Sequence, residues 1–118
     1  MHTLSQEQFD AFRAERISRT VTRICSHLAV HWQDDLEQRR IAVAQLQDEV
    51  DLWVRRSLDL GFRSERDIRI FCEACVVAGG DFPLRDCDAD IRSALHQAST
   101  STAKAQLVDE YLMTQFGR

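Results

Sequence analysis

The sequence predicts an all-α protein, a single-domain bundle of about five helices over residues 1–118. The chain has 118 residues, which is the size of one domain and too short for two independent cores. It contains one proline and four glycines, too few for the many tight turns of an all-β fold. Apolar residues recur at helical spacing, and no segment alternates apolar and polar residues for long enough to predict a strand.

The two longest helices are predicted from amphipathic spacing. Ser5 and Gln8 have the spacing of a capping box, so a first helix is expected over about residues 6–33. Its apolar stripe falls within roughly 80° on a helical wheel and comprises Ile17, Val21, Ile24, Leu28 and Trp32. The acidic residues at 34–35 favour the start of a second helix, and Gly61 favours its end. The inward residues of this second helix are expected to be Val43, Leu46, Val50, Trp53, Val54 and Leu58.

Three shorter helices follow. Ser64 with Asp67 is an N-cap signal for the third helix, which is expected to end at Gly79. Asp88 is expected to cap the fourth helix, and Thr102 the last. The apolar faces comprise Ile68, Phe71, Cys72, Cys75, Val76 and Ala78 in the third helix, Ile91, Ala94 and Leu95 in the fourth, and Leu107, Val108, Tyr111, Leu112 and Phe116 in the last.

Charge and hydropathy exclude several classes of partner. Fifteen basic and 19 acidic residues give a net charge of −4, without the basic excess that is typical of nucleic-acid binding. No run of about 18 apolar residues occurs, so no membrane segment is expected. The first residues lack the basic-then-apolar pattern of a signal segment, which favours a cytoplasmic location.

The four cysteines are Cys25, Cys72, Cys75 and Cys87, and we expect free, buried thiols. Cys72 and Cys75 form a C-x-x-C motif, but the motif falls inside a predicted helix, whereas a redox site places it at a helix start after a strand. Zinc bound by Cys72, Cys75, Cys87 and His96 is the alternative, although this spacing fits no common zinc finger. We therefore expect neither a metal nor a cofactor.

No catalytic constellation is evident. His27 and His31 are four residues apart, but Leu28 stands where a hydrolytic zinc helix needs a glutamate, so ordinary boundary histidines are expected. No carboxylate pair falls in an apolar setting, and neither a G-x-S-x-G motif nor a glycine-rich phosphate loop occurs. The sequence therefore predicts a protein that is not an enzyme.

Two segments suggest surfaces that bind a protein partner. On the first helix Arg16, Arg19 and Arg23 cluster opposite the apolar stripe, with Phe12 at a similar angle, and arginine beside an exposed aromatic residue is typical of an interface. The alternative is a solvated helix face. In the loop 81–85, the side chains of Phe82, Leu84 and Arg85 either close the end of the bundle or are offered to a partner.

A pattern within residues 50–112 resembles a known family. Its elements are GFRSERDI at residues 61–68, then Phe71, then GGDF at residues 79–82. The pattern is similar to that of small helical proteins encoded beside the spike and PAAR genes of bacterial type VI secretion systems. That family often has a proline and a tryptophan after the Asp-Phe turn, whereas here Pro83 directly follows Phe82 and no tryptophan is present there.

The resemblance implies an accessory role in effector loading. Some members of the family look like co-chaperones that bind a larger adaptor chaperone, which itself holds a toxic effector. We therefore expect the partner to be an adaptor chaperone, a secreted effector, or both, and the oligomeric state is left open. An immunity protein that neutralises a cognate toxin is the alternative, because an acidic chain of this size suits a basic nuclease.

Overall fold

The prediction of an all-α bundle is confirmed by a computed structural model, which describes the backbone of residues 6–117 and the side chains of residues 13–117. No strand occurs in residues 6–117. In chain order the elements are α1 (Gln6–His31), α2 (Gln33–Gln38), α3 (Val43–Asp59), α4 (Glu65–Ala78), the 3-10 helix η1 (Asp86–Asp88), α5 (Ala89–Gln97) and α6 (Ser101–Phe116).

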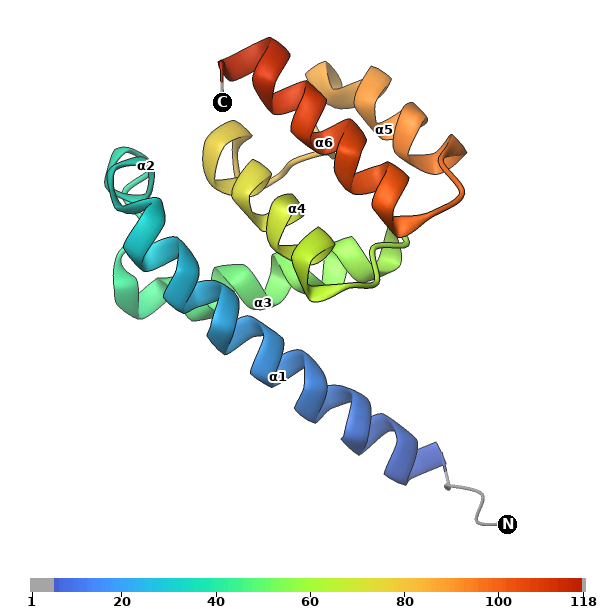
Figure 1. Ribbon diagram of the computed structural model, residues 1–118. Helices are drawn as coiled ribbons and strands as arrows, with labels where there is room; N and C mark the ends of the chain where they lie inside the picture. Colours follow the sequence, from blue (N-terminus) through green and yellow to red (C-terminus); the bar gives the residue numbers. More distant parts are fainter. Residues whose placement is uncertain (1–5, 118) are drawn as a thin grey trace.

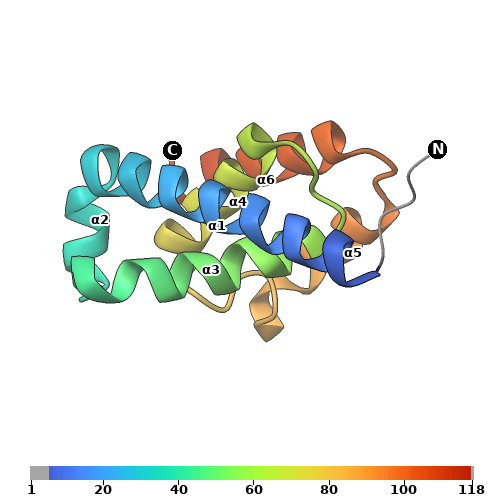
Figure 2. The same ribbon diagram turned by 90° about the horizontal axis from the view of Figure 1, so that it is seen from below.

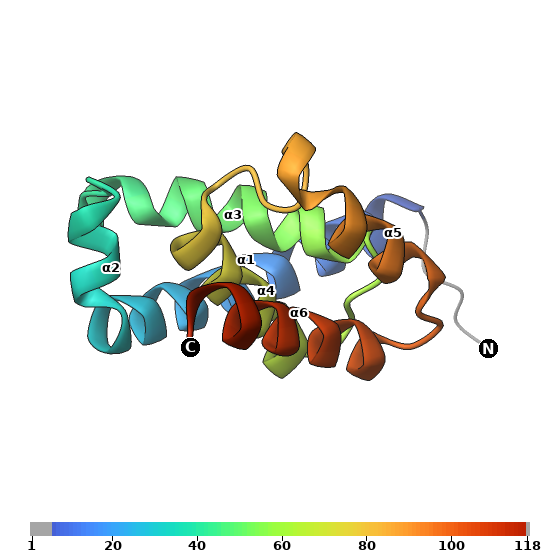
Figure 3. The same cartoon turned by 90° about the horizontal axis from the view of Figure 1, so that it is seen from above.

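The helices form two layers that share α4. α1 and α3 pack against each other and run in opposite directions, with α2 joining them at one end of the molecule (Figures 1 and 2). α4 packs against α3 on one side and against α6 on the other, and α5 lies beside α6 (Figure 3). The start of α1 extends away from the other helices (Figure 1).

A row of aromatic rings in tilted contact joins the two layers. The ring centroids of Phe62 and Phe71 lie 5.2 Å apart, those of Phe71 and Phe82 5.7 Å, and those of Phe82 and Tyr111 5.4 Å. The three phenylalanines are fully buried. Each such pair contributes about 0.5–1.5 kcal/mol beyond the burial of its area, so the row anchors the loops on either side of α4 to the core.

The second predicted helix is two helices in the structure, and this part of the prediction was wrong. α2 ends at Gln38, and Arg40 has a positive φ of 56° before α3 begins at Val43. The backbone closes the end of α2 around Arg40, where the N–H of Ile41 donates a hydrogen bond of 3.0 Å to the carbonyl of Leu36. The guanidinium of Arg39 also donates hydrogen bonds to the backbone carbonyls of Val76 and Val77, at the end of α4. The break also turns Val43 outward, where its side chain is 76% exposed rather than buried.

The predicted helix ends are confirmed at some positions and wrong at others. Ser64 caps α4, because its hydroxyl accepts a hydrogen bond from the Asp67 amide at 3.1 Å. Thr100, not Thr102, caps α6. Asp88 occupies the N-cap position of α5, but its carboxylate makes no capping bond. The capping box predicted at Ser5 lies outside the described residues.

None of the helices in residues 6–117 combines the length and the apolar character that crossing a membrane requires.

Candidate functional site

Three adjoining hollows form a continuous groove between the middle of α1 and the corner where α3 leads into α4. Their volumes are about 360, 340 and 440 Å³. The first shares Arg13, Ile17 and Leu58 with the second, and Arg16 and Arg63 with the third. We call the three together the arginine groove, because six arginines line it: Arg13, Arg16, Arg19, Arg23, Arg55 and Arg63.

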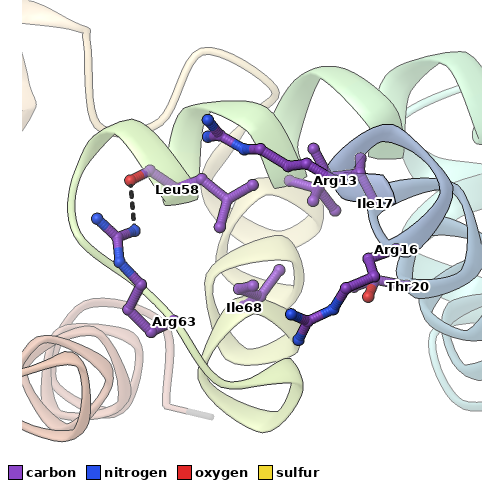
Figure 4. Close-up of a pocket in the computed structure, with 8 residues that line it drawn as sticks. Arg13, Arg16, Ile17, Thr20, Leu58, Arg63 and Ile68 are labelled. Atoms are coloured by element: carbon purple, nitrogen blue, oxygen red, sulfur yellow. Dashed lines mark hydrogen bonds between the residues drawn. The ribbon is translucent and has the colours of Figure 1, made fainter. Parts of the chain in front are cut away.

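The basic wall of the groove follows from the amphipathic character of α1. Ile17, Val21 and Ile24 are buried in the core, so the polar positions between them are left at the surface. Arg13 and Arg16 are three residues apart and therefore flank the buried Ile17 (Figure 4). The spacing that buries one face of α1 thus also lines up its arginines along the groove.

The opposite wall is formed by Arg63, which follows the end of α3. Gly61 adopts a positive φ of 100°, and the next residue, Phe62, enters the core. Arg63 then turns back, and its guanidinium donates hydrogen bonds of 2.8 Å to the backbone carbonyls of Leu58 and Phe62 (Figure 4). These bonds hold the charge of Arg63 at the end of α3, across the hollow from α1 (Figure 4).

The floor of the groove is apolar. Ile17 and Ile68 are buried beneath it, and the half-buried Leu58 lies between them and the rim (Figure 4). A partner that settles here would cover apolar side chains at the centre and meet guanidinium groups at the edge. Within protein interfaces, arginine around an apolar centre is typical of the residues that contribute most of the binding energy.

Positive charge is concentrated in the groove. Six arginines against Asp59 and Glu65 give the lining a formal charge of +4, so the rest of this −4 chain carries −8. Two of the arginines are already paired: Arg23 with Glu65 at 2.9 Å and Arg55 with Asp51 at 3.0 Å.

The remaining charges on α1 are open to a partner. Arg13, Arg16 and Arg19 are exposed and form no ion pair with any residue whose side chain the structure describes. Arg16, Arg19 and Arg23, which sequence analysis singled out, thus lie in one groove, while the side chain of Phe12 is outside the described part. Sequence analysis missed Arg13, although its spacing from Arg16 would have indicated it. It also missed Arg63, which no local signal connects with α1.

The loop after α4 corrects one prediction. Phe82 is 0% exposed and packs between Phe71 and Tyr111, so it closes the end of the bundle and cannot be offered to a partner. Leu84, in contrast, is 59% exposed. The guanidinium of Arg85 makes two hydrogen bonds of 2.8 Å to the carboxylate of Asp88 and a third to the backbone carbonyl of Ala78, so its role here is to brace the loop.

Asp88 is the most deeply buried charge of the loop, and its carboxylate also accepts a hydrogen bond from the hydroxyl of Tyr111 at 3.2 Å. Burial by itself raises the pKa of Asp88, but the hydrogen bonds and charge of Arg85, with the Tyr111 bond, outweigh burial and lower the pKa below its ordinary value. Conversely, burial and the negative charge of Asp88 raise the pKa of Tyr111.

The cysteines differ in their surroundings. Cys72 and Cys75 are buried in α4, and burial raises the pKa of both thiols. Cys25 is half-buried, and Cys87 is exposed, which corrects the expectation that all four are buried. Within the described residues, no three histidine, cysteine or carboxylate side chains come together as a metal-binding group.

One of the two histidines of α1, His27, meets a carboxylate of α4. The Nε2 atom of His27 lies 3.1 Å from Oε2 of Glu73, and the same oxygen accepts a hydrogen bond of 2.7 Å from the indole of Trp32. His31 is exposed, and the centroid of its ring lies 4.7 Å from that of His27, with the two rings tilted by 41°. Glu73 therefore ties the end of α1 to α4.

Fold and site together define an all-α bundle that carries a basic groove with an apolar floor. Comparison of the chain with protein-family models, with curated proteins and with solved structures finds no match.

Proposed function

We propose that this chain is a non-enzymatic accessory factor of the co-chaperone type, which binds an adaptor chaperone or an effector in the cytoplasm before type VI secretion. The observation that carries the proposal is the arginine groove, in which Arg13, Arg16 and Arg19 have no ion-pair partner among the described residues and stand beside an apolar floor. An exposed charge cluster beside apolar side chains is what a protein partner can cover.

The residues behind the family resemblance support this assignment by their place in the fold. Arg63, Glu65 and Ile68 belong to the GFRSERDI segment and line the groove, where Glu65 pairs with Arg23 of α1. Phe71 and Phe82, from the rest of the pattern, are in contact in the core. The pattern thus accounts both for the bundle and for one wall of its open surface.

The sign of the open charge favours this proposal over an immunity protein. The net charge of −4 suits a basic nuclease toxin, but the arginines left open in the groove are positive and would repel such a partner. An acidic surface on an adaptor or effector meets them favourably.

Co-purification tests the proposal. The tagged chain is expressed with each protein encoded beside it, as wild type, as an Arg13→Glu/Arg16→Glu/Arg19→Glu variant, and as the control Arg40→Glu. Arg40 is exposed and follows α2, at the end of the molecule away from the groove. We expect one neighbour to co-purify with the wild type and the control, and at least tenfold less with the triple variant.

Two results would contradict the proposal. One is that no neighbouring protein co-purifies, or that the triple variant retains its partner and supports effector delivery like the wild type. The other is that expressing this chain rescues growth of cells that produce a neighbouring toxin, which would assign it to the immunity class.

A further inference from the structure

The arginine groove has a direction that restricts what can occupy it. Arg13, Arg16 and Arg19, which form no ion pair with a described side chain, recur along α1 at intervals of three residues, and over these six residues α1 rises about 9 Å. On the facing side Arg63 stands at the rim near Arg16, since both line the same two hollows. The open positive charge therefore forms a line parallel to a helix, with an apolar strip beside it.

A helix matches this line better than an extended strand does. Carboxylates spaced three, four and seven residues apart on a partner helix share one face and can each approach one arginine of α1. The same face can place an apolar residue over Ile17 and Ile68. An extended segment gains its affinity chiefly by pairing with a sheet edge, and residues 6–117 contain no strand to pair with.

The floor and the surrounding charge disfavour nucleic acid. Phosphates would meet the arginines, but the apolar strip formed by Ile17, Leu58 and Ile68 would then be left without a matching group. The remainder of the chain carries a formal charge of −8, which repels a long polyanion that extends past the groove. A short acidic segment that ends within the groove meets only its positive walls.

We infer that the partner segment held in the arginine groove is an acidic amphipathic helix, with carboxylates facing Arg13, Arg16 and Arg63 and apolar side chains over Ile17, Leu58 and Ile68. The inference rests on the proposed function and adds the chemistry of the bound segment. At about 9 Å, the basic line matches roughly two turns of such a helix.

Selection from a display library of random 16-residue peptides tests the inference without knowledge of the partner. The library is selected on the wild-type protein, with Arg13→Glu/Arg16→Glu and Arg40→Glu proteins as comparisons, and all three are checked for the same helical circular dichroism. We expect the enriched peptides to carry two or more carboxylates together with apolar residues at helical spacing. A synthesised peptide should gain helicity on binding and bind the double variant at least tenfold more weakly than the Arg40→Glu control.

The inference is overturned if no peptide is enriched, or if the enriched peptides lack acidic residues. It is overturned as well if a peptide binds in an extended conformation, or binds the Arg13→Glu/Arg16→Glu protein as tightly as the Arg40→Glu control. It is also overturned if a 20-nucleotide single-stranded DNA binds more tightly than the best peptide, or if light scattering shows a dimer that Arg13→Glu/Arg16→Glu separates. If a neighbouring protein co-purifies through the groove while the enriched peptides lack acidic helical character, the inference fails and the proposed function stands. If none of the proteins encoded beside this chain co-purifies with it, the proposed function is wrong, whatever the peptide selection shows.

Discussion

Replacing Asp88 by asparagine is expected to destabilise the fold strongly, because this carboxylate organises the loop between α4 and α5. Its side chain is 0% exposed. It receives two hydrogen bonds of 2.8 Å from the guanidinium of Arg85 and one of 3.2 Å from Tyr111. Asparagine keeps the shape but removes the charge and replaces one acceptor oxygen with an amide that faces donors. Arg85 would then lose its counter-charge.

The size of the effect follows from the burial of the pair. Removing one partner of a buried ion pair costs about 3–5 kcal/mol. The side chain of Arg85 is 32% exposed, so water compensates part of the loss and we expect about 2–3 kcal/mol. For 118 residues the entropy of unfolding is about 0.25 kcal/mol per kelvin, so Tm should fall by about 8–12 °C.

Urea denaturation followed by far-ultraviolet circular dichroism measures this difference, with Asp86→Asn as the matched control. Asp86 is exposed in the same 3-10 turn and makes no ion pair with a described side chain. The control should cost less than about 0.5 kcal/mol. A loss below about 1 kcal/mol for Asp88→Asn, or equal losses for the two variants, would refute the reasoning.

The stability difference should also depend on pH. Because the folded protein lowers the pKa of Asp88, the charged carboxylate stabilises the fold above its ordinary pKa, and this contribution is lost as the pH falls through the lower, folded-state value. The gap between wild type and Asp88→Asn should stay constant from about pH 7 to pH 5 and narrow below about pH 4. A gap that widens on acidification would contradict the assigned direction.

Two further predictions separate core from surface in the same region. Phe82→Ala should lower the free energy of unfolding, measured by urea denaturation, by about 3–5 kcal/mol because it empties a fully buried site. Leu84→Ala should lower it by less than about 1 kcal/mol because Leu84 is exposed. Equal losses would mean that Phe82 is not a core residue. Ellman's reagent should titrate Cys87 rapidly in the folded protein and reach Cys72 and Cys75 only on unfolding, since burial raises their pKa. Because Cys25 is half-buried, the control removes it as well: a fast phase that survives in Cys25→Ser/Cys87→Ser would show that a buried thiol is accessible.

Much of the fold could be predicted because its signals are local. The apolar stripe of α1 and the Ser64 cap of α4 depend on residues within one or two turns of each other, and both are present in the structure. The break after Gln38 could not be predicted in this way. Arg40 adopts a positive φ although it is not glycine, and Arg39 bonds to carbonyls at the end of α4, 37 and 38 residues further along the chain.

The candidate site was predicted in part for the same reason. Arg16, Arg19 and Arg23 share one helix, so their spacing alone placed them on a common surface. Arg63 lies about 40 residues further along the chain and joins them only after Gly61 reverses the chain and Phe62 enters the core. Both roles of Phe82 stayed open at the level of sequence because an apolar residue in a loop can face either way, and the ring contacts with Phe71 and Tyr111 decide that it closes the bundle.

The order of residues by itself determined that this chain is helical and which face of each long helix turns inward, since helix formation and amphipathicity depend on neighbours three and four positions apart. Only the tertiary structure decided where the walls of the arginine groove meet, and that Leu84 rather than Phe82 is exposed. Both outcomes depend on packing between segments distant in the chain, and such packing leaves no periodic trace in either segment alone.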